Sequence, residues 1–237
     1  MQAKWLWLAV GMVMVGMLVI SALAPPPATA ALLPSGTPRP RQSPTPEIGV
    51  EQSRTLYTLN RPLAALYLLN QIIALEGTET DTIVLFRAYL LHGQIQAALD
   101  NPTQAIIDYT RAINLQPDIA EVYAYRGTLY QSQAAYDDAL QDFSQAIEYD
   151  GSEANYYVAR AQVYLAVEAY GSAAADYAEA LLLEPNNAAY YRERGYVWLA
   201  AGEVSAAVGD FNTYLELVPN APDQGEIEAA ISAASPD

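Results

Sequence analysis

The chain has 237 residues, of which 52% are hydrophobic, and a formal net charge of −16 at pH 7. It contains no cysteine and one histidine, which excludes disulfides, thiolate chemistry and the common Cys/His metal cages. From residue 47 onward there are 8 arginines and 27 acidic residues, a net charge of −19, and a surface of that sign repels nucleic acid. We therefore expect no nucleic-acid partner, no metal and no cofactor.

Residues 1–24 form an apolar N-terminal segment. Residues 5–24 carry no charge and follow Lys4. Their number is sufficient to span a bilayer, which favours a transmembrane anchor, whereas the Ala-x-Ala pattern that ends at Ala30 is typical of signal-peptidase cleavage. The sequence leaves both alternatives open. Both predict that the rest of the chain lies outside the cytoplasmic membrane, as a membrane-anchored, periplasmic or secreted protein.

Residues 25–46 hold 8 of the 15 prolines in the chain. Proline at this density blocks both helices and strand ladders, and it favours an extended spacer. We expect a passive linker here, and the folded part is predicted to begin near Glu47.

The following part of the chain repeats itself with a constant 34-residue period. Gly127, Ala161 and Gly195 are separated by this step. Three copies align without gaps, over residues 120–153, 154–187 and 188–221. Each copy has the pattern of two helices of about a dozen residues joined by a short turn. A single unit of this kind cannot bury its apolar face alone, so the sequence predicts an all-α solenoid of stacked helix pairs.

An earlier copy spans residues 81–119, and in it Arg87 and Ala88 are aligned with the Arg-Gly pair of the later copies. The step from Ala88 to Ala105 is longer by five than the equivalent step from Gly127 to Ala139 in the next copy. We therefore expect a five-residue insertion between the two halves of this unit. Pro102 is predicted to begin its second helix.

The array is predicted to have atypical ends. Residues 47–80 form a degenerate first copy, so that the array covers residues 47–220 with about four clear units and one degenerate unit. Residues 222–235 are predicted to form a capping helix that covers the last apolar face.

One pair of opposite charges recurs in each clear unit. In the three ungapped copies an arginine is followed sixteen residues later by an aspartate, and in the inserted copy the interval is twenty-one. We interpret the pairs as structural salt bridges that hold the first helix against the second. They are Arg87–Asp108, Arg126–Asp142, Arg160–Asp176 and Arg194–Asp210.

The pattern Tyr-x-x-Arg-Gly-x-x-Tyr at residues 123–130, followed by Tyr-x-x-Ala-x-x-x-Phe-x-x-Ala at residues 136–146, resembles the tetratricopeptide repeat. This resemblance implies a right-handed superhelix in which the first helices line a concave groove. It also implies that the groove binds a peptide or another protein, and that the chain acts as an adaptor or scaffold rather than as an enzyme.

The resemblance places ten candidate residues for protein binding in the groove. Most of them are apolar, aromatic or neutral, and Arg192 is the single cation, which favours a partner segment with apolar and aromatic anchors. Glu121 and Glu193 are the only acids expected there. The candidates are Leu85, Phe86, Tyr89, Tyr125, Thr128, Asn155, Val158, Gln162, Arg192 and Tyr196.

Two other functions compete with the binding scaffold. The array could associate with itself as a structural assembly. It could also be a carboxylate-dependent enzyme acting on glycans, which would need two acids in one cleft. Glu121 and Glu193 belong to copies two steps apart, so the sequence gives the enzymatic alternative the least support, and we expect no catalytic residue.

Overall fold

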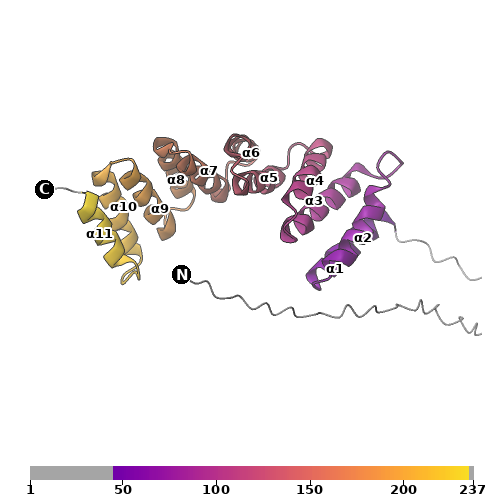
Figure 1. The fold of residues 1–237 in the computed structure, drawn as a ribbon, viewed down its shortest axis with the longest axis horizontal. Helices are drawn as coiled ribbons and strands as arrows, with labels where there is room; N and C mark the ends of the chain where they lie inside the picture. Colours follow the sequence, from indigo (N-terminus) through magenta and orange to yellow (C-terminus); the bar gives the residue numbers. More distant parts are fainter. Residues whose placement is uncertain (1–44, 235–237) are drawn as a thin grey trace, which may run out of the picture. The chain divides into compact units, whose positions relative to one another are not determined.

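The computed structural model describes residues 45–234, so the predicted N-terminal segment 1–24 and nearly all of the linker lie outside the described residues. Within the described range the chain forms eleven α-helices and no strand (Figure 1). The helices are α1 (Pro46–Thr58), α2 (Pro62–Ile73), α3 (Thr82–Ala98), α4 (Pro102–Leu115), α5 (Ala120–Ser132), α6 (Tyr136–Tyr149), α7 (Ala154–Ala166), α8 (Tyr170–Leu183), α9 (Ala188–Ala200), α10 (Val204–Leu217) and α11 (Gln224–Ala234).

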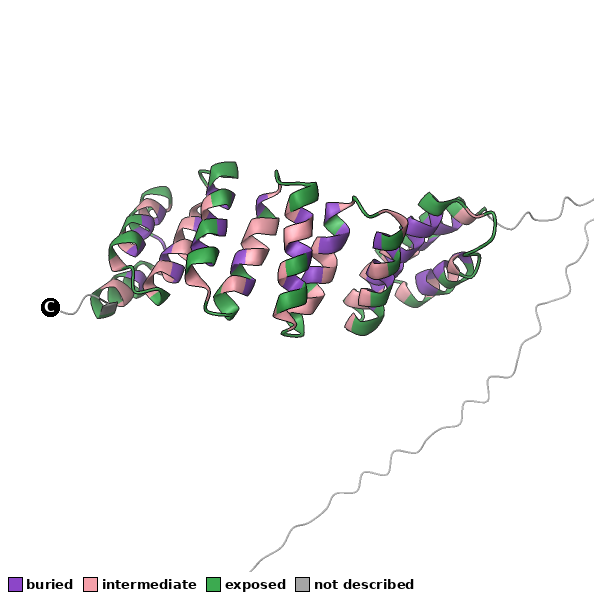
Figure 2. Ribbon diagram, turned by 90° about the horizontal axis from the view of Figure 1, so that it is seen from above, coloured by how far each residue is buried: buried purple, intermediate pink, exposed green. Residues whose placement is uncertain are grey.

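The helices of residues 45–234 pack as five consecutive pairs followed by a single helix. The pairs are α1 with α2, α3 with α4, α5 with α6, α7 with α8 and α9 with α10, and the first helix of each pair also packs on the second helix of the pair before (Figure 1). This is the all-α solenoid that the repeat period predicts. Figure 2 shows buried residues mainly where neighbouring helices meet, with exposed residues on the outer surfaces.

Small residues at one repeated position allow the two helices of a pair to approach closely. Ala105, Ala139, Ala173 and Ala207 follow one another at 34-residue intervals in the second helices, and all four have no exposed surface. Four residues after each of them comes a large buried ring: Tyr109, Phe143, Tyr177 and Phe211, none more than 2% exposed. Close packing of rings against small residues is how each pair removes its apolar face from water.

The turn inside each pair is also repeated. Its residues with positive φ are Asn60, Asp100, Ala134, Glu168 and Gly202, and the last four follow one another at the period of the repeat. Because one left-handed residue reverses the chain after each first helix, the same helix–turn–helix geometry recurs along the array.

The first helices lie on the inner side of the curved array. Two consecutive pairs of first helices, α1 with α3 and α5 with α7, make closer contact than any two consecutive second helices. We use the name first-helix face for the surface formed by α1, α3, α5, α7 and α9. At the C-terminal end of the array, α11 packs on α10 and buries Ile227 completely against Phe211 and Tyr214.

Candidate binding groove

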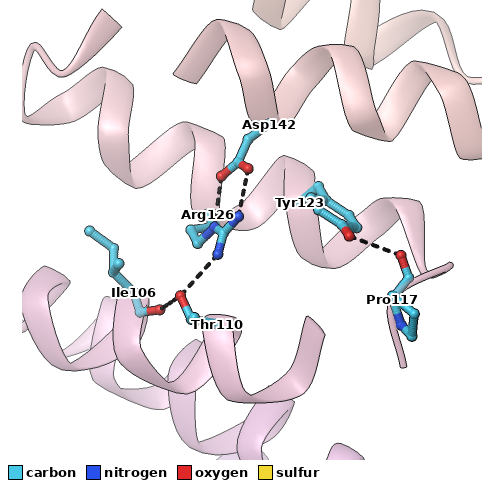
Figure 3. Close-up of polar contacts among 6 residues, drawn as sticks. All are labelled: Ile106, Thr110, Pro117, Tyr123, Arg126 and Asp142. Carbon is cyan, nitrogen blue, oxygen red and sulfur yellow. Dashed lines mark hydrogen bonds and ion pairs between the residues drawn. The ribbon is translucent and has the colours of Figure 1, made fainter. Parts of the chain in front are cut away.

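Bidentate ion pairs fix the first helix of three units against the second. Arg126 donates from Nε and Nη2 to the two carboxylate oxygens of Asp142, both at 2.8 Å (Figure 3). Arg160 makes the same contacts with Asp176 at 2.8 Å, and Arg194 with Asp210 at 2.7–2.8 Å. Three of the four predicted pairs therefore form. The hydrogen bonds to Asp176 raise the pKa of Arg160 above its ordinary value, although burial opposes this effect.

Two of these arginines also contact the preceding unit. Nη1 of Arg126 donates to the hydroxyl of Thr110 on α4 at 2.9 Å (Figure 3), and Nη1 of Arg160 donates in the same way to Ser144 on α6. Each guanidinium thus links three helices from two units. A planar group with donors in fixed directions sets both the spacing and the rotation between neighbouring units, and hence the form of the first-helix face.

The predicted pair Arg87–Asp108 does not form. Asp108 is 2% exposed and accepts a hydrogen bond from Nδ1 of His92 at 2.7 Å, and a second from Gln104 at 3.1 Å. His92 and Gly93 precede Arg126 and Gly127 by one full repeat, so the period continues and the predicted five-residue insertion is wrong. The additional residues are instead at the start of α3, which begins at Thr82, four residues before the position equivalent to the start of α5.

This shift of register also removes three predicted groove residues. Leu85, Phe86 and Tyr89 are 5%, 7% and 5% exposed. The rings of Phe86 and Tyr89 pack in the core with Tyr109 and Tyr123, and the Tyr89 hydroxyl donates to Glu76 at 2.5 Å. They are packing residues, and the prediction that they line the groove is wrong.

In the corrected register Arg87 takes the groove position that Glu121 occupies in the next unit. Its exposed side chain lines a pocket of about 780 Å³ between α1 and α3, together with Glu47, Glu51 and the apolar Ile48. Sequence reasoning missed this pocket because Arg87 had been assigned to the ion pair with Asp108.

A second pocket, of about 670 Å³, lies on the first-helix face between α5 and α7. We call it the α5–α7 pocket. It brings together two of the predicted groove residues, Tyr125 of one unit and Asn155 of the next. Its remaining lining is Asp118, Ile119, Ala120, Glu121, Ala124, Tyr149, Asp150, Glu153 and Tyr156. The prediction that Glu121 and Glu193 are the only groove acids is wrong, because the loops before α5 and α7 contribute three more carboxylates.

The ring of Tyr125 lines the α5–α7 pocket. It stacks on Tyr109 with ring centroids 5.7 Å apart, and its hydroxyl donates to Glu121. Burial, the hydrogen bond to Glu121 and the charge of Glu121 raise the pKa of Tyr125 to about 12. The hydroxyl and backbone N–H of Ser152 donate to Asp150, another lining residue, and hold the pKa of Asp150 below its ordinary value. An acid kept ionised in this way is unsuited to general-acid catalysis.

The other predicted groove residues do not line this pocket. Thr128 and Gln162 are exposed on α5 and α7, and Val158 is half-buried against the core. Arg192 is held by Glu193 at 2.8 Å and by Asp223, just before α11, at 3.3 Å. Tyr196 packs edge to face on Phe211. Of the candidates, Tyr125 and Asn155 line the α5–α7 pocket, and Arg192 and Tyr196 lie at the α9–α11 end of the array. Thr128, Val158 and Gln162 belong to neither place.

The described part of the chain offers neither a metal cage nor a membrane span. Residues 45–234 contain no cluster of three or more histidine, aspartate or glutamate side chains placed to hold a metal ion. None of the helices in this range combines the length and apolar character needed to cross a membrane. The predicted apolar span 5–24 lies outside the described residues.

Comparison with protein families gives two matches. Two tetratricopeptide repeat models match residues 86–119 and 161–232. The first match begins at Phe86 and is one repeat period long, which agrees with the register set by His92 and Gly93. A comparison with curated proteins finds no match.

Solved structures share the fold at low sequence identity. A crystal structure of MamA is 17% identical, covers 76% of this chain and 94% of its own, and has a TM-score of 0.67. MamA from Desulfovibrio magneticus RS-1 is 18% identical, with 74% and 96% covered and a TM-score of 0.64. YrrB, described as a tetratricopeptide repeat protein with an unusual peptide-binding site, is 14% identical, with 78% and 90% covered and a TM-score of 0.65.

Proposed function

Because the chain is a tetratricopeptide repeat protein, we propose that it is a non-enzymatic scaffold that binds a segment of another protein along its first-helix face. The observation that carries this proposal is the α5–α7 pocket, which joins Tyr125 and Asn155 from two consecutive units in a single hollow of about 670 Å³. A hollow between units can take a side chain of a segment that lies across several units. The description of YrrB as a peptide-binding protein gives further support.

The side chains of this pocket are suited to holding a peptide. Tyr125 and Tyr156 are half-buried, so each ring offers contact area at a small cost in conformational entropy. Asn155 is exposed, and its amide has both donor and acceptor groups for a peptide backbone. The ion-paired arginines hold the helices that carry these residues, so the groove is in place before the ligand binds, which lowers the cost of binding.

The test is selection of peptides from a random display library on the full-length protein. Asn155→Trp would fill the pocket with an indole, whereas Ala175→Trp places the same side chain at an exposed position on α8, outside the pocket. We expect selected peptides to lose binding to Asn155→Trp and to keep it with Ala175→Trp. Peptides that bind both variants equally, or a failure to select any peptide, would count against a binding groove. Circular dichroism establishes that both variants fold.

We also propose that the array works outside the cytoplasmic membrane. The support is the uncharged stretch of residues 5–24 and the proline-rich linker that follows it. Protease added to intact spheroplasts should digest the array while a cytoplasmic marker survives. Full protection of the array until the membrane is lysed would exclude this location. The mass of the mature protein decides between a cleaved signal and a retained anchor.

A further inference from the structure

The α5–α7 pocket is lined by four acidic residues and no basic residue. Asp118 and Glu121 come from the start of α5 and the loop before it, and Asp150 and Glu153 come from the loop that leads into α7. None of the four takes part in the salt bridges of residues 45–234. By contrast, each buried aspartate inside a unit contacts an arginine or His92.

Three of these four carboxylates are oriented by hydrogen bonds that each accepts on only one of its two oxygens. Glu121 accepts from Tyr125, and Glu153 accepts from Nδ2 of Asn155 at 2.7 Å. Asp150 accepts from the backbone N–H and the hydroxyl of Ser152, at 3.0 and 2.6 Å, both on Oδ1. Within residues 45–234 the second oxygen of each of the three accepts no hydrogen bond from the protein. The pocket therefore offers oriented acceptors that a ligand can use.

The same three carboxylates also raise the pKa of one pocket residue, Tyr156. Burial raises the pKa of Tyr156, and the negative charges of Glu121, Asp150 and Glu153 raise it further. Charges from α5 and from the loop before α7 thus act on the same hydroxyl of the pocket. A pocket with carboxylates from α5 and from the loop before α7 suits a cation whose charge is spread over several donors.

We propose that the α5–α7 pocket takes an arginine side chain of the partner segment, an inference that rests on the peptide-binding function proposed above. A guanidinium is planar and presents five N–H donors, so it can meet carboxylates from both walls of the pocket. Its flat face can also stack on a tyrosine ring, and Tyr125, Tyr149 and Tyr156 all line the hollow. A lysine ammonium keeps the charge but not the planar fork or the stacking.

The arginines elsewhere on the first-helix face lie beside acidic residues of their own, and exposed Arg87 lines the α1–α3 pocket together with Glu47 and Glu51. Arg192, the one cation that the sequence predicted for the groove, is bound by Glu193 and Asp223. An acidic segment is therefore repelled at the α5–α7 pocket without gaining a free arginine at the α9 end. Charge complementarity selects a basic segment with its arginine at α5–α7.

The experiment measures fluorescence anisotropy of a labelled heptapeptide with one central arginine between alanine and tyrosine residues, at low ionic strength, with the full-length protein. Matched peptides carry lysine, citrulline or glutamate at the central position. We expect affinity to fall from arginine to lysine to citrulline, with no binding of the glutamate peptide. The double variant Glu121→Gln/Glu153→Gln should weaken arginine-peptide binding about tenfold.

The control removes the same charge elsewhere. Asp137→Asn/Asp138→Asn neutralises two acids in the first turn of α6, outside the pocket, and should change the affinity less than about twofold. Equal loss in the two double variants would show a general attraction to an acidic surface and overturn the proposal. Equal binding of arginine and citrulline peptides, or binding of neither, would also overturn it.

The library selection separates this proposal from the function on which it rests. Peptides that lose binding to Asn155→Trp but contain no arginine would leave the binding groove intact and refute the arginine pocket. The absence of any peptide sensitive to Asn155→Trp would refute the binding groove itself. Enrichment of one arginine in peptides that are sensitive to both Asn155→Trp and Glu121→Gln/Glu153→Gln supports both proposals.

Discussion

Nδ1 of His92 lies 2.7 Å from Oδ2 of Asp108, at the place where each of the next three helix pairs holds an arginine against an aspartate. The histidine makes one hydrogen bond to the carboxylate where arginine makes two. Its other ring nitrogen, Nε2, is buried and has no hydrogen-bond partner within residues 45–234. This unit is therefore held by a weaker version of the contact that its neighbours share.

His92→Arg is expected to maintain or raise stability. The replacement is the residue found at the equivalent position of three units, where its donors satisfy both oxygens of the aspartate and avoid a buried nitrogen without a partner. Urea unfolding of the variant and the parent measures the change. His92→Leu is the control, and it should destabilise by about 2 kcal/mol because Asp108 loses its hydrogen-bond partner on α3. If His92→Arg lowered the free energy of unfolding more than His92→Leu, the space beside Asp108 would be too small for a guanidinium.

Breaking one ion pair should cost more than replacing both of its members. Arg160→Ala leaves Asp176, with a side chain 7% exposed, without its bidentate partner, and we expect a loss of about 3 kcal/mol in the free energy of unfolding. In Arg160→Met/Asp176→Leu no charge remains buried, so this double variant should lie close to the parent. Urea unfolding is again the measurement. A double variant as unstable as Arg160→Ala would mean that the pair stabilises through its contact with Ser144 and the preceding unit.

A methyl group at Gly195 should be destabilising. A Cβ there would lie 2.7 Å from Cε1 of Phe211, whose side chain is completely buried and cannot move away easily. Overpacking of this kind costs about 1–3 kcal/mol, so Gly195→Ala should lower the melting temperature.

The matched control for that substitution is Gly209→Ala on α10. A Cβ at Gly209 meets no atom within 4 Å, and its helical position favours alanine over glycine by about 1 kcal/mol. The same chemical change should therefore destabilise at Gly195 and stabilise at Gly209. Thermal unfolding that shifts in the same direction for both would contradict the close approach of α9 and α10.

The array should lose stability at alkaline pH through its buried tyrosines. Burial, followed by the charge of Glu193, raises the pKa of Tyr177 to about 12. This folded-state pKa lies above the unfolded value of about 10. The contribution of protonated Tyr177 to the free energy of unfolding is therefore fully present below pH 10 and is lost as the pH rises toward 12. Tyrosinate absorbance and circular dichroism should change together in that interval.

Tyr177→Phe tests this assignment. It keeps the ring that packs in the core of the fourth unit but removes the group that ionises. We expect little change in stability at pH 7 and a smaller loss above pH 10 than in the parent. An unchanged alkaline transition would assign the loss to other tyrosines, of which Tyr109 has its pKa raised most, first by burial.

The sequence by itself determined the repeated unit. The constant spacing of Gly127, Ala161 and Gly195 predicted helix pairs, and the constant interval between Arg126 and Asp142 predicted an ion pair that forms as a bidentate contact. These features could be derived because they depend on contacts inside one unit, and the copies in the chain can be compared with one another. The family resemblance agreed with the fold for the same reason.

Only the tertiary structure decided how units meet and where special residues are used. His92, and not Arg87, contacts Asp108 because α3 begins about one turn before the position equivalent to the start of α5. The spacing of residues in α4 gives no sign of this early start. The acidic α5–α7 pocket draws Asp118 and Asp150 from loops of different units. Loop residues far apart in the chain come together only when the units stack, and the stacking angle depends on the sum of many packed side chains rather than on any local pattern.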